Sequence, residues 1–90
     1  MNSQQSLSKE LRDILNIVAD LSYNDINSGV FDHRIIAKAN NLPQDEVRNY
    51  LDQLKSRGLI REDIQPTSAS FRLYMITAEG IQELEDQDQK

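Results

Sequence analysis

The segment from Pro43 to Gly58 constrains the fold more than any other part of the chain. Its apolar residues recur every three or four positions and predict an amphipathic helix that buries Val47, Leu51 and Leu54, with Tyr50 beside them. The proline lacks an amide hydrogen where a helix start needs none, and two acids follow it at the positive end of the helix dipole. Gly58 can adopt the left-handed conformation that ends many helices. The segment therefore predicts a helix docked by its apolar side, with a polar side left exposed.

A similar apolar stripe predicts an earlier helix over residues 7–21, with Ser6 or Ser8 accepting from the free amides of its first turn. The segment 23–29 is rich in turn-forming residues and should end this helix. The apolar pair at 30–31 is long enough only for a short strand. These features predict a helix, a loop and a strand stub before the central helix.

A short second helix is expected after the strand stub and through Asn40. Asp32 is a suitable N-cap for it, and the pair Asn40–Asn41 tolerates the left-handed turn that would stop it. The residues that this helix should bury are Ile35, Ile36 and Ala39.

Two β-rich runs, 59–64 and 71–76, follow the central helix. The segment 65–70 between them is too long for a two-residue turn, so they predict a hairpin with a longer loop. The buried face of the second run stays open, because a slip of one residue exchanges one alternating set for the other. The two sets are Tyr74 with Ile76, and Phe71 with Leu73 and Met75.

A last helix is predicted from Thr77, its N-cap, through about Glu85, burying Ile81 and Leu84. The expected organisation is a disordered tail at 1–6, one domain at 7–85 and a frayed acidic tail at 86–90.

The composition limits the classes of function. The chain has 90 residues, 38% of them hydrophobic, with one histidine and no cysteine. It therefore predicts one soluble cytoplasmic domain without a disulfide framework, a membrane span or a cysteine zinc site. We find no nucleophile–base pattern and no phosphate-binding glycine loop, so neither an enzyme nor a cofactor is expected. His33 is assigned no catalytic role, and the C-terminal acids lack the spacing of a calcium loop.

The net charge of −5 is unevenly distributed. Residues 1–29 carry two bases and four acids, and residues 77–90 carry one base and five acids. Residues 30–76 carry seven bases and six acids, a net charge of +1. This near-neutral middle permits contact with phosphates without requiring it.

The order of elements resembles the winged helix-turn-helix family, an α+β fold that is mostly α, with a two-stranded wing and a closing helix. Three segments carry the resemblance. They are the helix and turn at 36–43, the central helix with its glycine stop and following strand at 47–60, and the Thr-x-x-Gly segment at 77–80.

The resemblance implies a sequence-specific, double-stranded-DNA-binding transcription regulator that lays its third helix, about 44–57, in the major groove. The implied DNA-binding residues are Gln44, Arg48, Asn49, Asp52, Lys55 and Ser56 on that helix, Arg34 and Lys38 on the helix before it, and Arg61 and Arg72 in the wing strands. Arg48 and Asn49 would read bases, and Lys55 would contact phosphate. A homodimer through the first and last helices would enlarge the small contact that one domain makes.

An acidic protein-binding module or adaptor is the alternative reading. Asp45, Arg48, Asp52 and Lys55 stand three or four positions apart, so the third helix can neutralise its own charges. The wing tip at 65–70 contains no lysine or arginine, which DNA-binding wings commonly carry. A basic partner protein would suit a chain of this charge better than a polyanion does.

Overall fold

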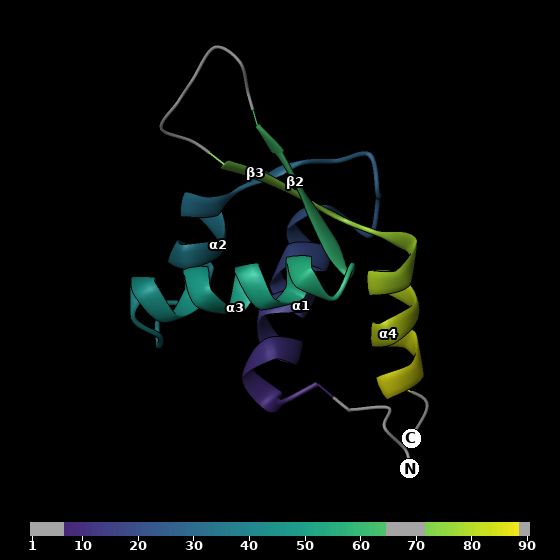
Figure 1. Ribbon diagram of the computed structural model, residues 1–90, viewed down its shortest axis with the longest axis horizontal. Coiled ribbons are helices and arrows are strands. Elements are labelled where there is room, and N and C mark those ends of the chain that lie inside the picture. Colours follow the sequence, from purple (N-terminus) through teal and green to yellow (C-terminus); the bar gives the residue numbers. More distant parts are fainter. Residues whose placement is uncertain (1–6, 65–71, 89–90) are drawn as a thin grey trace.

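The computed structural model describes residues 7–64 and 72–88 (Figure 1). Four helices and three short strands follow one another in the predicted order. They are α1 (Lys9–Leu21), β1 (Val30–Phe31), α2 (Asp32–Lys38), α3 (Gln44–Ser56), β2 (Ile60–Ile64), β3 (Arg72–Ile76) and α4 (Ala78–Asp88). The sequence predictions for residues 1–6, for the wing tip at 65–70 and for Phe71 lie outside the described residues.

Helix α1 begins and ends as its sequence indicates. The hydroxyl of Ser8 accepts a hydrogen bond from the amide of Leu11 at 3.2 Å, so Ser8 and not Ser6 is the N-cap. At the other end the amide of Asn24 donates to the carbonyl of Ala19 at 2.9 Å. This turn requires left-handed backbone at Tyr23 (φ 57°) and Asn24 (φ 60°).

Helix α2 differs from its prediction at both ends. Phe31 is the N-cap, and Asp32 is the first helical residue, with its buried side chain directed toward α3 rather than to the amides of its own helix. The helix ends at Lys38, before Asn40, and neither Asn40 nor Asn41 adopts a left-handed conformation. A hydrogen bond from the amide of Leu42 to the carbonyl of Ala39, 3.0 Å, closes the turn instead.

Helix α3 confirms its predicted apolar side, since Val47, Leu51 and Leu54 are fully buried. Its N-cap is Pro43, so the proline stands one position before the helix rather than inside its first turn. Gly58 has a φ of +78°, and an added Cβ there would meet nothing within 4 Å. Glycine is therefore required at this position for the backbone conformation and not for space.

The three strands form an antiparallel sheet in the order β1-β3-β2. Its register decides the face that the sequence left open: Tyr74 and Ile76 enter the core, opposite Glu62 and Ile60. Met75 points to the other face, where the guanidinium of Arg61 covers its sulfur at 3.8 Å. The strand β2 begins at Ile60, one residue later than predicted.

Thr77 and Gly80 attach α4 to the end of α3. The Thr77 hydroxyl accepts from the amide of Gly80 at 3.0 Å, which confirms the predicted cap, and donates to the carbonyl of Gly58 at 2.7 Å. A Cβ on Gly80 would collide with the carbonyl oxygen of Leu59. The helix runs to Asp88, three residues beyond the predicted end.

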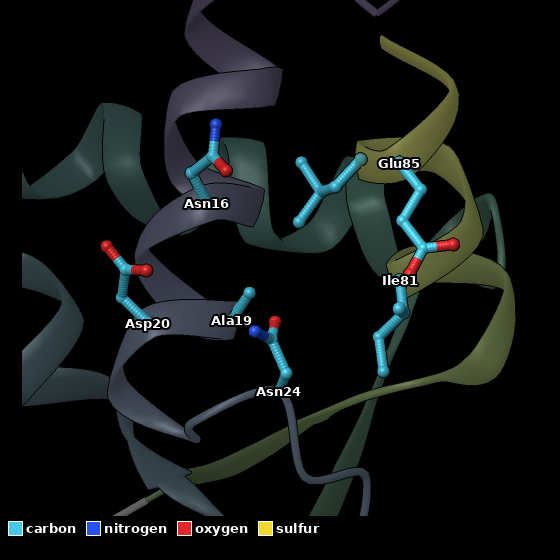
Figure 2. Close-up of a pocket in the computed structure, with 7 residues that line it drawn as sticks. Asn16, Ala19, Asp20, Asn24, Ile81 and Glu85 are labelled. Carbon is cyan, nitrogen blue, oxygen red and sulfur yellow. The ribbon is translucent and has the colours of Figure 1, made fainter. Parts of the chain in front are cut away.

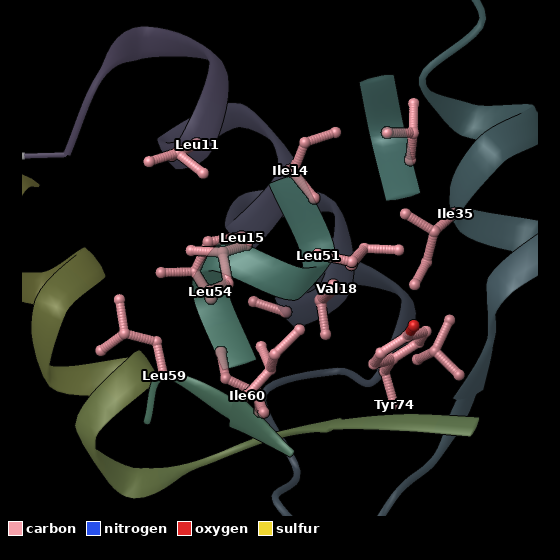
Figure 3. Close-up of a cluster of buried hydrophobic side chains, with 14 of the residues drawn as sticks. Leu11, Ile14, Leu15, Val18, Ile35, Leu51, Leu54, Leu59, Ile60 and Tyr74 are labelled. Carbon is pink, nitrogen blue, oxygen red and sulfur yellow. The ribbon is translucent and has the colours of Figure 1, made fainter. Parts of the chain in front are cut away.

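One hydrophobic core lies between the helices and the inner face of the sheet (Figure 3). Ile14, Leu15 and Val18 reach it from α1, and Leu51 and Leu54 reach it from α3. Ile35, Ile60 and Tyr74 close it from α2 and the sheet, and Leu84 of α4 is also buried. This packing holds α3 by its apolar side and leaves its polar side at the surface, as the sequence predicted. The architecture is α+β, mostly α, and is that of a winged helix-turn-helix.

Candidate nucleic-acid interface

The polar side of α3 is uncovered, which is the condition for its use as a recognition helix. Asp45, Asn49, Asp52 and Ser56 follow one another at spacings of four, three and four, opposite the buried stripe, and all four are exposed. We call these four residues the outer ridge of α3. It carries two acids and no base.

The basic residues of α3 lie on one flank of the helix, beside the outer ridge. By helical periodicity Gln44, Arg48 and Lys55 share this flank, which faces α2 at one end and the hairpin at the other. Each of the two bases meets an acid of a neighbouring element there. The bases of the flank are therefore held in ion pairs with neighbouring elements, whereas the outer ridge makes no such pair with the described residues.

Arg48 pairs with Asp32 of α2. The guanidinium Nη2 lies 3.7 Å from the carboxylate Oδ2, a distance of an ion pair rather than of a hydrogen bond. The Asp32 side chain is 7% exposed and that of Arg48 is 51% exposed. The buried acid thus faces an arginine whose side chain remains half-exposed.

Lys55, Glu62 and Arg72 form a second group, which we call the Glu62 clamp. The Lys55 Nζ donates to Glu62 Oε1 at 2.8 Å, and Arg72 Nη1 donates to Oε2 at 3.0 Å. The Glu62 side chain is 8% exposed, because the two bases from α3 and β3 cover it. The hydrogen bond from Lys55 and the positive charge of both bases lower the pKa of Glu62, against the opposing effect of its desolvation.

The structure does not gather all the predicted site residues. Arg34 is exposed on α2, and Lys38 borders a cleft of about 340 Å³ with Lys9 and Glu10 of α1, away from the Glu62 clamp. Arg61 lies on the opposite face of the hairpin from Glu62, because successive strand residues alternate. The residues that come together are Arg48, Lys55 and Arg72, each of them with a carboxylate partner.

The predicted neutralisation of charge within α3 is not what the structure shows. Arg48 and Lys55 direct their ion pairs to α2 and β2, not to Asp45 or Asp52 on their own helix. Sequence reasoning missed both partners, Asp32 and Glu62. A signal for Glu62 exists, since it and Arg72 occupy the same face of paired strands, but reading it requires the register.

Three further sequence expectations concern His33, metal ligands and a membrane span. The ring of His33 stacks on Phe31, with centroids 5.8 Å apart and planes at 14°. Across the described parts of the chain, no three acidic, histidine or cysteine residues are grouped so that they could hold a metal ion. In the same residues, no helix is both long and apolar enough to cross a membrane.

The fold is shared with solved transcription regulators. BpsR of Bordetella bronchiseptica matches with a TM-score of 0.74 at 21% identity over 90% of this chain and 56% of that one. A mutant MarR from E. coli complexed with operator DNA matches with a TM-score of 0.75 at 16% identity, over 92% of this chain and 54% of that one. MepR of S. aureus, in a complex with DNA, matches with a TM-score of 0.71 at 20% identity, over 92% of this chain and 63% of that one.

These likenesses show the winged helix-turn-helix fold, and the chain spans a little over half the length of the regulators it matches. No protein-family model matches the sequence. No curated protein matches it either.

Proposed function

We propose that this domain is a DNA-binding module of a transcription regulator, with α3 entering the major groove. The observation that carries the proposal is the position of α3, held by its apolar side beside a flank where Arg48, Lys55 and Arg72 are restrained in place. Arg48 and Asn49 would contact base edges, and Lys55 and Arg72 would contact phosphates. BpsR, MarR and MepR, which share the fold, are described with their DNA binding or in complexes with DNA, and this supports the same partner here.

The remaining predicted contacts have supporting roles in this proposal. Gln44, Asp52 and Ser56 would lie near the groove walls, and Arg34, Lys38 and Arg61 would add contacts to the sugar–phosphate backbone. The proposed role is non-catalytic, and a cytoplasmic location is proposed with it.

The test is a salt-titrated binding assay with duplex DNA of random and of selected sequence. Replacement of Arg48 by alanine should reduce discrimination between sites by about 1–3 kcal/mol, because a base contact is lost. Lys38→Ala should weaken binding to all sequences and reduce the salt slope by about one unit. Lys38→Arg, which keeps the positive charge at this position, is the matched control and should change neither quantity.

No binding at low ionic strength would reject the DNA proposal in favour of a protein partner. The exposed acids Asp45 and Asp52 on the outer ridge are the observation that favours this second candidate, since they would repel the phosphates beside the groove. A basic helix placed on α3 would instead be attracted to them. Equal and salt-independent effects of the Arg48 and Lys38 variants would lead to the same conclusion.

A homodimer through α1 and α4 stays a proposal about assembly. Two copies would double the DNA contact, which is small for a single domain at roughly 600–1,000 Å². Sedimentation equilibrium of the free domain tests it, and a monomer at all concentrations would refute it.

A further inference from the structure

The wing hairpin is attached to the rest of the fold at two places along its length. The hairpin rises from the C-terminal end of α3 (Figure 1), where the hydroxyl of Thr77 donates to the carbonyl of Gly58 at 2.7 Å. The Glu62 clamp is the second attachment, farther along the strands. There Lys55, in the last turn of α3, and Arg72, at the start of β3, both bind the carboxylate of Glu62 on β2.

The strand register explains how the clamp reaches the outer part of the wing. Glu62 is paired with Tyr74 at the middle of the β2–β3 ladder, and Ile64 is paired with Arg72 at its outer end. Arg72 therefore reaches diagonally back to Glu62 along one face of the hairpin. The ladder holds the two strands to each other, and the ion pair of Lys55 with Glu62 holds them to α3.

The layering of the clamp decides between two roles for Glu62, a competitor of phosphate or a support for the bases. The Glu62 side chain is 8% exposed, whereas those of Lys55 and Arg72 are 41% and 58% exposed. The bases therefore lie between the carboxylate and the solvent. A phosphate can meet them without displacing Glu62, because an ammonium and a guanidinium each have several donors and these bonds use one of each.

Release of the two bases from Glu62 would be unfavourable. It would leave a buried carboxylate without its partners, and the desolvation of the charge would no longer be compensated. The lowered pKa of Glu62 has the same cause, since both bases favour the charged form of the carboxyl group. Glu62 therefore stays in place beneath the bases when an anion approaches them from solvent.

We propose that Glu62 is a positioning residue for DNA binding: without contacting DNA, it holds Lys55 of α3 and Arg72 of the wing so that both meet the phosphate backbone together. This inference rests on the proposed DNA-binding function. Charge-assisted hydrogen bonds order the two long side chains before DNA arrives, so less entropy is lost on association. An acidic residue then strengthens binding to a polyanion, which is the opposite of what its charge alone would do.

The experiment compares variants of equal net charge. Glu62→Gln removes the carboxylate of the clamp, and Asp63→Asn removes the carboxylate of the next residue in β2. Asp63 is exposed, points to the other face of the strand and makes no ion pair with any residue in 7–64 or 72–88. Glu85→Gln removes the same charge at a cleft between α1 and α4 to which neither α3 nor the hairpin contributes (Figure 2).

Affinity for a random-sequence DNA duplex is measured by fluorescence anisotropy over a range of salt concentrations. Asp63→Asn and Glu85→Gln should bind as tightly as the wild type or up to about twofold more tightly, because a negative charge is removed. Glu62→Gln should bind about three- to tenfold more weakly than Asp63→Asn, despite the equal net charge. Its salt slope should also be smaller, because fewer phosphates are contacted.

A further set of variants separates positioning from a structural role. In a protein with Lys55→Ala and Arg72→Ala, Glu62 has no base to position, so adding Glu62→Gln should change the affinity no more than adding Asp63→Asn does. A weakening that persists in this background would show that Glu62 acts through the fold. If Glu62→Gln does not fold, Glu62→Asp keeps the charge but shortens the reach to the two bases, and it should bind more weakly than the wild type.

Equal affinities of Glu62→Gln and Asp63→Asn would overturn the proposal. Tighter binding by Glu62→Gln would also overturn it and would identify the carboxylate as a competitor of phosphate. In both cases the wild type binds the duplex, and the proposed function stands. A wild-type domain that does not bind the duplex at low ionic strength would reject both proposals, so the two failures are distinguishable.

Discussion

At the scale of single residues, two buried carboxylates organise the candidate interface. Asp32 and Glu62 each have side chains less than one-tenth exposed, and each is directed at basic groups of the α3 flank. Burying a carboxylate is unfavourable unless charge and hydrogen bonds compensate it. The bases are therefore held where a phosphate or an acidic group would meet them.

The Glu62 clamp should make stability depend on pH. Its lowered pKa means that Glu62 stabilises the fold above its ordinary value of 4.5, and that this contribution is lost as the pH falls through the lower folded value. Urea denaturation at several pH values should show the wild type more stable than Glu62→Gln by about 1 kcal/mol near neutrality. The difference should shrink below pH 4.5.

Glu85→Gln is the control for that experiment, because Glu85 is exposed, lies outside the first turn of α4 and makes no ion pair with any residue in 7–64 or 72–88. A difference between wild type and Glu62→Gln that stays constant down to the acid transition would show that the clamp does not contribute.

At the scale of elements, the junction between α3, β2 and α4 determines how the closing helix is placed. Thr77 accepts from Gly80 and donates to Gly58, and its own amide donates to the carbonyl of Leu59 at 3.1 Å. Gly80 lets the backbone of α4 approach Leu59 more closely than a Cβ allows. The position of α4 therefore depends on these contacts.

Two alanine substitutions test this junction. Alanine normally favours a helix over glycine by about 1 kcal/mol, yet Gly80→Ala should destabilise the fold by about 2–3 kcal/mol, since its Cβ meets backbone that cannot move freely. Gly58→Ala has open space but a left-handed φ, and should lose only about 1 kcal/mol. Urea denaturation tests whether Gly80→Ala loses more unfolding free energy than Gly58→Ala. A Gly80→Ala variant as stable as the wild type would contradict the close packing.

Much of this level of structure follows from local patterns in the sequence. The cap at Thr77, a serine cap at position 6 or 8, the stop at Gly58 and the apolar side of α3 were predicted because each depends on neighbours within about one turn. The N-terminus of α2 was predicted wrongly, because Asp32 serves a partner on another helix. The end of α2 was also predicted too late, because a local hydrogen bond from Leu42 to Ala39 closes the turn before Asn40. At the start of β2, the carbonyl of Leu59 accepts from the distant amide of Thr77, a contact that the local sequence does not contain.

At the scale of the whole molecule, the excess of acid lies away from α3. The bases of the α3 flank and β3 are accompanied by acids, and the acids at the two ends of the chain meet on α1 and α4. Such a distribution orients a domain in the field of a polyanion while its net charge of −5 slows the approach.

Removal of distant acids should therefore change the rate of DNA association without a contact being altered. Glu79→Gln with Asp86→Asn should raise the association rate about twofold at low ionic strength, and the gain should vanish when salt screens the field beyond about 10 Å. Stopped-flow anisotropy with duplex DNA measures both. An effect confined to the dissociation rate would contradict long-range steering.

The sequence by itself determined the succession of helices and strands, the apolar side of α3 and the uneven distribution of charge, because these depend on period, caps and composition. Only the tertiary structure decided which acids hold Arg48, Lys55 and Arg72, and which set of alternating residues in β3 enters the core. It also packed α1 against α4, which carry acids from the two ends of the chain. These features depend on strand register and helix packing, which join residues far apart in the chain and leave no periodic trace in it.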